Sequence, residues 1–344
     1  MRLLAFALPL ICTAPVLAAD VAYTKPVGGF TNAAAASTDT RISPVLARDA
    51  AWVGTIASVS ATTLTAAGTP NWTASAFGPG ASTYYARVLS GAQRGQYFII
   101  TASTTDTLTV DNAGLNLTTI TAGDAFEVVP FWTLGTLFPA SQAGSAFVAS
   151  SSALARQTEV LTYDATQTGI NRASSGTYYF LNGAWRKVGS SAGTSFDSTL
   201  IFPDGYVIQR NKAAATTLVQ TGRVQPAYLG SVIEATASAQ NDNFVSISFP
   251  IDVTLDQVGL AGTVFAASSS PLAISDQLLW YDPAATGINV ASSATYYYYN
   301  GAWRKRGSSA SLNFGSTVLK AGSGFIIRKA ANGTSGTWNF ATGI

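Results

Sequence analysis

The feature that most constrains how this chain can fold is a long internal repeat. Residues 147–191 match residues 265–309 without a gap, at a constant offset of 118 residues, and both copies contain the hexapeptide NGAWRK. With one inserted residue, the match continues from Phe202–Arg210 into Lys320–Lys329. A period this long indicates a duplicated domain, because solenoid repeats span about 20–50 residues. A similar segment also precedes each copy, since NDNFVSISFPIDVTL (from Asn241) faintly echoes TDTRISPVLARDAAW (from Thr38).

The residue pattern along the chain predicts an all-β protein. Short runs rich in Thr, Val, Ile and aromatic residues alternate with Gly, Asn, Asp and Ser, and no long segment shows helical periodicity. We therefore expect a small N-terminal β-barrel or sandwich-like domain, followed by a duplicated antiparallel β-sandwich-like unit. The expected divisions are a signal peptide at 1–19, an N-terminal β domain at 20–135, a first β repeat at 136–223, and a second repeat with its strand-rich spacer at 224–344.

Five candidate strands fall in the expected N-terminal domain, separated by turn-forming residues. They are Trp52–Val59, Tyr84–Ser90, Gly95–Thr101, Asp106–Val110 and Asp124–Pro130. The segment SGAQRG between the second and third of them predicts a hairpin turn. In the second strand, the alternation of residues should leave one face buried and the other face partly exposed.

The first residues, MRLLAFALPLICTAPVLAAD, have the form of a secretory signal peptide. A positive start at Arg2, an apolar stretch and a small-residue site near Ala18 and Ala19 match that pattern. We therefore expect export to the periplasm, cell surface or extracellular space, and a mature chain that does not span the membrane. Cleavage would also remove Met1 and Cys12, the single methionine and cysteine, and the sequence contains no histidine. The mature chain would then lack disulfides, Cys or His zinc sites and Ser-His-Asp triads.

The charge pattern gives little basis for binding nucleic acid. Without Arg2 the chain carries 18 Lys and Arg against 17 Asp and Glu, and charged residues make up 10% of the sequence. Soluble proteins average about 25%. No basic run stands out, so we expect no nucleic-acid partner. Most strand-like runs are also shorter than the roughly 10 alternating residues of a transmembrane barrel strand.

Each copy of NGAWRK follows an aromatic run, as TYYFLNGAWRK and TYYYYNGAWRK. Asn-Gly between two strand-like runs predicts a type I′ hairpin turn, whose two central residues have positive φ. A two-residue loop fixes the register, so each Trp should face an aromatic residue and each Arg should face a Tyr. The residues concerned are Tyr179, Trp185 and Arg186 in the first copy and Tyr297, Trp303 and Arg304 in the second.

Two interpretations fit these hairpins. A flat Trp beside Tyr and Arg is the arrangement with which carbohydrate-binding modules hold sugars, so the six residues are candidate ligand-binding residues. Alternatively, the aromatic pairs contribute about 0.5–1.5 kcal/mol each as cross-strand packing, and each Tyr–Arg pair adds about 0.5–1 kcal/mol. The scaffold interpretation is favoured, because every repeated residue then has a packing role in the hairpin.

A second motif, Y-D-x-x-x-T-G-I-N, also occurs in both copies. Its candidate metal-ligating residues are Asp164 and Asn171 in the first copy and Asp282 and Asn289 in the second. Ca²⁺ could be held by such oxygens together with backbone carbonyls, although a single carboxylate per site is few. Asp and Asn more often bond the backbone of their own loop. We therefore expect loop structure and no cofactor, with calcium as the alternative.

Several stretches resemble an uncharacterised family of exported, β-rich bacterial proteins of about this length. They are WVGTIASV, GDAFEVVPFWTLGTLF (Gly123–Phe138), the two TYY-x-x-NGAWRK hairpins and GSGFIIRK. The resemblance covers most of the mature chain. It implies no activity and no binding residue.

These features predict an exported, non-enzymatic structural or surface-associated β-protein, whose partner is a second copy of itself or a cell-surface glycan. One alternative is a carbohydrate-binding module-like protein that uses the paired aromatic hairpins. The other is an enzyme acting on polysaccharides through a pair of carboxylates about 5–10 Å apart. The acidic residues that lie close in sequence in the first copy are Glu159, Asp164, Asp197 and Asp204.

Overall fold

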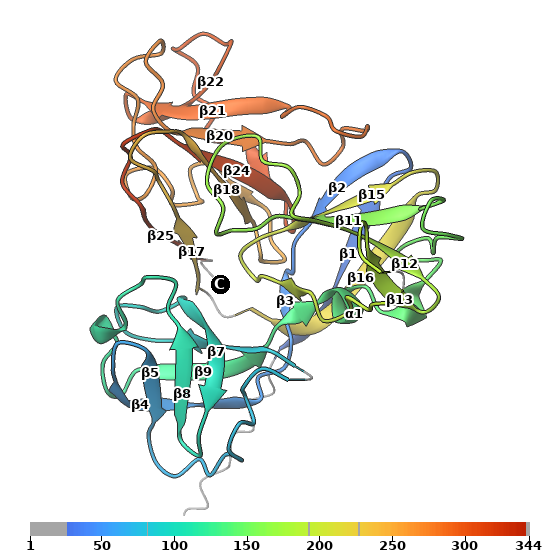
Figure 1. Cartoon of the computed structure of the whole chain (residues 1–344). Helices are drawn as coiled ribbons and strands as arrows, with labels where there is room; N and C mark the ends of the chain where they lie inside the picture. The colour runs from blue at the N-terminus through green and yellow to red at the C-terminus, as the bar shows by residue number, and fades with distance from the viewer. Residues whose placement is uncertain (1–25, 81, 192, 226–227, 342–344) are drawn as a thin grey trace, which may run out of the picture.

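The computed structural model describes residues 26–80, 82–191, 193–225 and 228–341, and the expected signal peptide lies outside these ranges. The described chain is all-β, as expected. Its helical segments are short: α1 (Leu134–Leu137) and two 3₁₀ turns at Leu117–Thr119 and Ala140–Gln142. Three β units make up the fold, a barrel and two repeat units, and Figure 1 shows the barrel below the two repeats.

A closed six-stranded barrel is built from residues 52–130, with strand order β4-β5-β8-β7-β6-β9. Its strands are β4 (Trp52–Val59), β5 (Thr63–Ala66), β6 (Tyr84–Val88), β7 (Tyr97–Ser103), β8 (Thr107–Asp111) and β9 (Ala125–Pro130). The five predicted strands and the β6–β7 hairpin are confirmed. The four-residue β5 was missed. Ala86 and Val88 point into the barrel core, whereas Tyr85 and Arg87 on the outer face are buried as well, because the repeats cover that face.

The first repeat unit contains a five-stranded antiparallel sheet of order β13-β12-β11-β15-β2. These strands are β2 (Thr38–Ile42), β11 (Thr158–Thr162), β12 (Gly176–Leu181), β13 (Ala184–Lys187) and β15 (Val207–Asn211). Against it lies a sheet of order β1-β16-β3, made of β1 (Val27–Ala34), β16 (Thr216–Val224) and β3 (Leu46–Ala47). The short pair β10 (Trp132–Thr133) and β14 (Leu200–Ile201) completes the unit.

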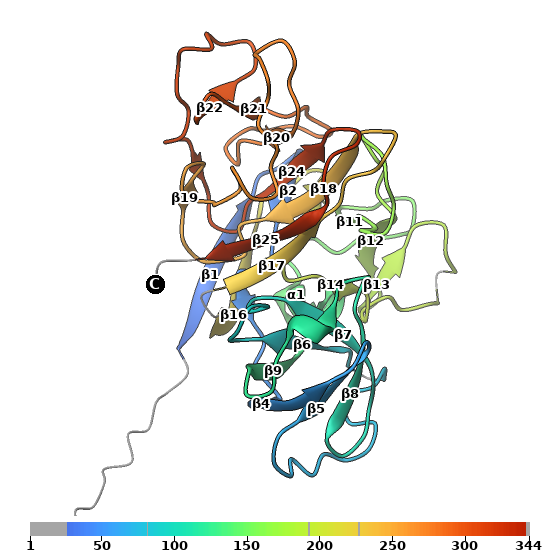
Figure 2. The ribbon, with the colours of Figure 1, turned by 90° about the vertical axis from the view of Figure 1, so that its left-hand side faces the viewer.

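The second repeat unit has the same topology. Its five-stranded sheet has the order β22-β21-β20-β24-β18, made of β18 (Asn241–Ser246), β20 (Gln277–Trp280), β21 (Ala294–Tyr299), β22 (Ala302–Lys305) and β24 (Gly324–Lys329). The pair β17 (Tyr228–Ile233) and β25 (Gly336–Ala341) corresponds to β1 and β16. The pair β19 (Val253–Thr254) and β23 (Val318–Leu319) corresponds to β10 and β14. Figure 2 shows β17, β25, β18 and β24 together on one side of the molecule.

The barrel interrupts the first repeat unit. Strands β1, β2 and β3 precede the barrel in sequence, yet β2 pairs with β15 and β1 pairs with β16. Figure 1 shows the blue β1 and β2 beside the yellow strands of the first repeat. The expected boundary at residues 20–135 therefore differs from the strand pairing, which assigns residues 27–47 to the first repeat. Local patterns could not show this, because the partners lie more than 160 residues away.

The faint echo between Thr38–Trp52 and Asn241–Leu255 corresponds to real structural equivalence. Asp39 of β2 pairs with Arg210, and Asp242 of β18 pairs with Arg328. The two arginines are 118 residues apart, so the constant offset of the repeat reaches the last strand. The alignment of the two copies in this strand therefore needs no inserted residue, contrary to our expectation from the sequence.

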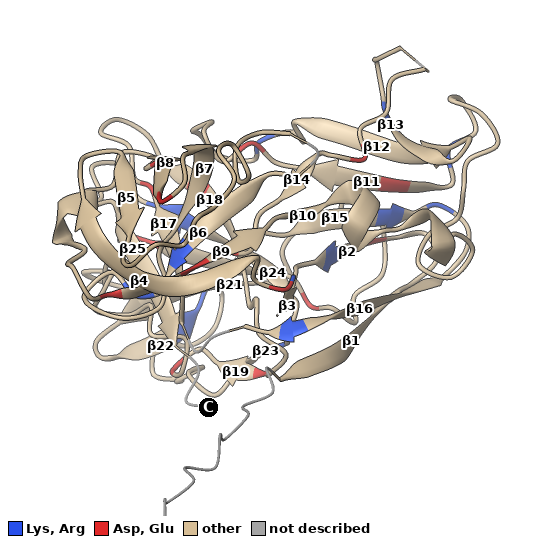
Figure 3. Cartoon of the chain, turned by 90° about the horizontal axis from the view of Figure 1, so that it is seen from below, with Lys and Arg blue, Asp and Glu red and all other residues tan. Residues whose placement is uncertain are grey.

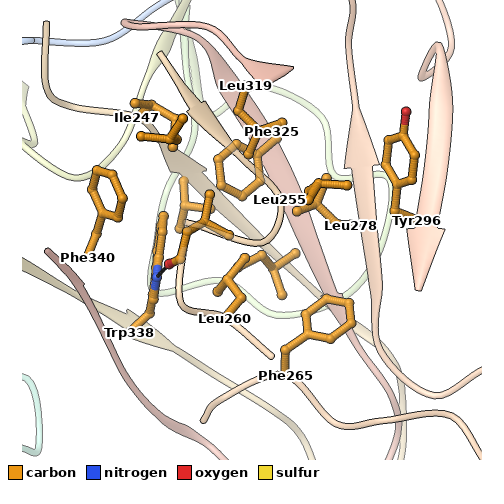
Figure 4. Close-up of a cluster of buried hydrophobic side chains, with 14 of the residues drawn as sticks. Ile247, Leu255, Leu260, Phe265, Leu278, Tyr296, Leu319, Phe325, Trp338 and Phe340 are labelled. Atoms are coloured by element: carbon orange, nitrogen blue, oxygen red, sulfur yellow. Dashed lines mark hydrogen bonds between the residues drawn. The ribbon is translucent and has the colours of Figure 1, made fainter. Parts of the chain in front are cut away.

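Each unit has its own hydrophobic core. The barrel core, the core of the first repeat and the core of the second are separate clusters of buried side chains. Figure 4 shows the core of the second repeat, to which Phe265, Leu278, Phe325 and Trp338 contribute from different segments of the chain. The Trp338 indole is 1% exposed and donates to the Val258 carbonyl at 2.7 Å, so its polar atom is satisfied within the core.

Candidate functional site

The two aromatic hairpins have the predicted register. Phe180 pairs with Trp185 in the first copy, and Tyr298 pairs with Trp303 in the second. Asn182 and Gly183 have φ values of 50° and 79°, as a type I′ turn requires. The same backbone recurs at residues 300–301. The Asn-Gly signal therefore predicted both the turn and the pairing.

The proposed sugar platform is wrong at these hairpins, because its aromatic rings are core residues. The indoles of Trp185 and Trp303 are 0% and 1% exposed. Trp185 packs against Phe147 with ring centroids 4.9 Å apart, and Trp303 packs against Phe265 at 5.0 Å. The accompanying Tyr179 and Tyr297 are also buried. The four aromatic rings named for the platform are therefore packed inside the protein, and of the other hairpin aromatics Tyr298 and Tyr299 are partly exposed.

The two hairpin arginines hold loops over the sheet edges. Arg186 Nη1 donates to the Gly193 carbonyl at 2.8 Å, and Arg304 Nη1 donates to the Leu312 carbonyl at 2.9 Å. Each loop follows its hairpin and returns along the edge strand, where Phe196 N donates to the Trp185 carbonyl. The repeated Trp-Arg therefore serves the scaffold in both copies.

The residues that we named as candidate calcium ligands have other contacts in the structure. Asp164 Oδ1 accepts from Thr166 N at 2.9 Å, and Asp282 Oδ1 accepts from Ala284 N at the same distance, which are local turns of the loop-forming kind. The hydrogen bonds from Thr166 lower the pKa of Asp164. The amide oxygens of the two asparagines accept from arginines, and a guanidinium there opposes cation binding. Within the described ranges, no group of three or more acidic, His or Cys side chains could hold a metal ion.

The T-G-I-N loop of the first copy docks on the second repeat. The Gly169 carbonyl accepts from Asp242 N at 3.0 Å, and Asn171 N donates to Asp242 Oδ2 at 2.8 Å. Arg328 binds the same Asp242 carboxylate through Nε at 2.7 Å and donates from Nη2 to Asn171 Oδ1 at 2.8 Å. One Asp–Arg pair therefore holds both the backbone and the side chain of the incoming loop.

The corresponding loop of the second copy docks on the first repeat in the same way. The Gly287 carbonyl accepts from Asp39 N at 3.0 Å, and Asn289 N donates to Asp39 Oδ2 at 2.9 Å. Arg210 pairs with Asp39 at 2.7 Å and donates to Asn289 Oδ1 at 2.5 Å. We call the two loops and their Asp–Arg pairs the inter-repeat joint. Its contacts are related by a pseudo-twofold axis, because each repeat gives a loop and receives one.

Backbone conformation explains why this motif is the same in both copies. Gly169 and Gly287 have φ values of 114° and 123°, a region that side chains with a Cβ disfavour. Asn171 and Asn289 have φ values of 52° and 56°, where Asn is tolerated better than most residues. The sequence interpretation recognised this loop chemistry but missed its partners, Asp39 and Asp242. The echo of TDTR in NDNF was the signal that could have found them.

Buried polar contacts join the barrel to the first repeat. Glu127 of the barrel forms ion pairs with Arg87 on the neighbouring strand and with Arg223 of β16, the latter at 2.9 Å. Burial tends to raise the pKa of Glu127, but the two arginines lower it on balance. Tyr97 Oη donates to Asp204 Oδ1 at 2.7 Å, and burial raises the pKa of that carboxyl group.

A cavity of about 380 Å³ lies between the barrel and the first repeat. Arg48, Thr133 and Asp197 are among the polar residues that line it. Asp197 already accepts hydrogen bonds from Trp185 N and from Ser195 Oγ, both at 2.8 Å. Of the four acidic residues that lie close in sequence in the first copy, only Asp197 lines this cavity.

The other three of these carboxylates have partners elsewhere. Glu159 pairs with Arg156 and Lys212, Asp164 closes its loop, and Asp204 meets Tyr97. Burial opposes ionisation of Glu159, but hydrogen bonds from its two basic partners lower its pKa. Each of the four acids thus has its own structural contact.

One repeated surface feature was missed in the sequence. Leu154 and Leu272, which are 118 residues apart, are 94% and 99% exposed. Each lies at the tip of an A-S-S-S-x-L-A loop, where Ser152 Oγ or Ser270 Oγ accepts from the leucine N at 3.3 Å. We call these two residues the leucine tips. Retention of SSS-x-LA in both copies was the available signal. The serine hydroxyl groups accept hydrogen bonds from the loop backbone in both copies, whereas packing does not account for the retained leucine.

The charged side chains are scattered along the strands of the described chain, with basic and acidic residues interspersed (Figure 3). Among the helices of that part of the chain, none has the length and apolar character needed to cross a membrane. No protein-family model matches the chain, and neither a curated protein nor a solved structure matches it.

Proposed function

We propose that this chain is an exported, non-enzymatic β-protein with a structural or surface-associated role. The observation that carries the proposal is the use of the two repeated motifs. The aromatic hairpins form the repeat cores and the T-G-I-N loops form the inter-repeat joint, so what is duplicated is scaffold. A ligand site at either of these two motifs would instead leave the motif's own side chains unpaired at an accessible surface.

The leucine tips support the surface-associated part of the proposal. A leucine that becomes fully buried against another surface contributes about 1.5–3 kcal/mol. Two such tips on one chain can act together, so that modest contacts give firm attachment when both engage. The low charge of the chain leaves apolar contact as the main source of that attachment.

Fractionation of producing cells, followed by electron microscopy of the purified protein, tests the proposed role. We expect the protein in the cell-surface fraction or in ordered assemblies. Turnover of a polysaccharide by the purified chain, lost when an Asp or Glu is replaced, would overturn the non-enzymatic assignment. A protein retained wholly in the cytoplasm would overturn the assignment to an exported one.

The leucine tips can be tested without disturbing the fold. The double variant Leu154→Ser and Leu272→Ser should keep the wild-type melting temperature, because both side chains are exposed, and should move protein from the cell-bound to the soluble fraction. Leu312→Ser is the matched control, since Leu312 is 52% exposed and has threonine at the equivalent position of the first copy. An unchanged distribution of the double variant would contradict attachment through the tips.

A further inference from the structure

Strand β1 has an open backbone edge. It pairs with β16 over eight consecutive residues, Val27–Ala34, without a bulge. Val224 N donates to the Pro26 carbonyl at 2.9 Å, which makes these two residues a hydrogen-bonded pair. In an antiparallel pair, residues that bond the partner strand alternate with residues whose N–H and C=O groups point away from it. Since Pro26 bonds β16, the residue after it and every second residue from there point away from β16. The residues with outward groups are Val27, Gly29, Thr31 and Ala33.

These outward groups have no protein partner in the described chain. Within residues 26–80, 82–191, 193–225 and 228–341, these four residues form no hydrogen bond with any segment other than β16. Their side chains are also exposed, and none of them is charged. A strand edge of this kind can pair with another strand.

Four other strand edges, those of β2, β18, β13 and β22, are covered. The loop at Gly287 covers β2 and the loop at Gly169 covers β18. Strands β13 and β22 end in Arg-Lys and have loops folded along them. The closest comparison is β17, the counterpart of β1, where Gly230 N donates to the Gly95 carbonyl of the barrel at 2.8 Å. The first strand of the second repeat thus has an edge partner, whereas β1 has none among the residues that the structure describes.

The sequence of β1 lacks the usual protection of an edge. VGGFTNAA contains no lysine, no other charge and no proline, although natural proteins use such residues to block edge pairing. Gly29 has its outward groups in the middle of the edge, and glycine in a strand often marks close approach of another backbone. The edge is therefore suited to a backbone partner rather than shielded from one.

We propose that β1 pairs antiparallel with β1 of a second copy of this chain, forming a continuous sheet of order β3-β16-β1-β1-β16-β3. A twofold dimer brings the same patch together from both copies, so the patch must complement itself. The four uncharged side chains meet this need, because no like charges face each other across the axis. If the expected signal peptide is removed after residue 19, six residues precede Pro26, too few to turn back and cover the eight-residue strand.

The proposal rests on the proposed structural function, and it names the partner as a second copy. Its test is measurement of solution mass by light scattering and sedimentation, using the full secreted chain over a range of concentrations. We expect the wild-type mass to reach twice that of one chain. Thr31→Lys should return the mass to that of one chain, since two lysines would then lie close together across the axis.

Thr217→Lys is the matched control, because Thr217 is exposed on the same face but lies on β16, away from the edge. It should remain dimeric, and both variants should melt with the wild type. A wild-type monomer at all concentrations, or a dimer that survives Thr31→Lys, overturns the pairing of β1. Neither outcome bears on whether the protein is an enzyme, because that is tested separately by measuring polysaccharide turnover.

Discussion

The two halves of the inter-repeat joint have the same polar contacts but different packing around them. Tyr163 of the first copy stacks on Phe244 at 4.1 Å, with the rings 13° from parallel. Its counterpart Tyr281 lies under the guanidinium of Arg41, which is 3.2 Å from the ring centroid. A Tyr face accepts either an aromatic ring or a cation. Side chains can therefore be exchanged, while the contacts that fix the backbone are retained.

The pseudo-twofold axis itself forces one difference between the copies. Tyr206 and Gly324 occupy equivalent positions, 118 residues apart, and a Cβ added at Gly324 would lie 2.3 Å from the Tyr206 ring. Only one of the two positions can carry a bulky side chain. The comparison teaches that the repeats are equivalent in topology but fitted to each other, so they should not be interchangeable.

The largest loss of stability that we expect follows from replacing the buried hairpin tryptophan that the two repeats share. Trp185→Ala and Trp303→Ala should each reduce the free energy of unfolding by roughly 3–5 kcal/mol, because both indoles lie in separate, closely packed cores. Chemical denaturation checks this. Equal losses would support the equivalence of the repeats, whereas a variant that kept its stability and lost only glycan binding would restore the sugar platform.

The joint should respond unequally to loss of its acidic anchors. Asp242→Ala should cost roughly 3–5 kcal/mol, because the Asp242 side chain is 0% exposed and its removal leaves Arg328 unpaired. Asp39→Ala should cost less, since the Asp39 side chain is 6% exposed and that of its partner Arg210 is 17% exposed. Thermal melting of both variants gives the order. A larger loss at Asp39 would contradict the ranking by burial.

The fit at the axis can be measured by a double-mutant cycle. Gly324→Ala should destabilise the protein by about 1–3 kcal/mol through overpacking. Tyr206→Ala removes the ring that the new methyl group meets, so the double variant should recover part of that loss. A coupling of about 0.5–3 kcal/mol is expected for residues in contact. Additive effects would show that these two positions do not constrain each other.

Sequence reasoning succeeded where the information was local. Asn182-Gly183 contains its own turn geometry, so the register of the hairpin followed from two residues. The five predicted barrel strands were located in the same way, from their own residue pattern and the turn residues between them. It failed for β2, whose partner β15 lies beyond the whole barrel, because nothing near Asp39 indicates what it pairs with.

Burial was the other limit of sequence reasoning. Tyr178 and Tyr179 point to opposite faces of β12, yet both are buried, because loops and neighbouring segments cover the outer face. Alternation along a strand separates the two faces without saying what covers each of them. The pattern was therefore consistent with both an exposed platform and a core.

The smallest effect concerns Asp204, an acid that becomes Gly322 in the second copy and that contacts the barrel only in the first. Burial raises its pKa, against opposing hydrogen bonds from Tyr97 and Ser231. The folded state therefore keeps the proton on Asp204 to a higher pH than the unfolded state, in which the pKa of Asp is about 3.9. The stability that this proton gives to the folded state is lost as the pH rises through the folded pKa.

Asp204→Asn keeps an acceptor for Tyr97 and removes this decline, so its melting temperature relative to wild type should rise between pH 4 and pH 7. Asp252→Asn is the control, because a hydrogen bond from Lys320 lowers the pKa of Asp252 and the stability it gives is lost only as the pH falls below about 4. Its melting temperature relative to wild type should therefore stay constant between pH 4 and pH 7. Parallel pH profiles for Asp204→Asn and wild type would contradict a raised pKa at the junction with the barrel.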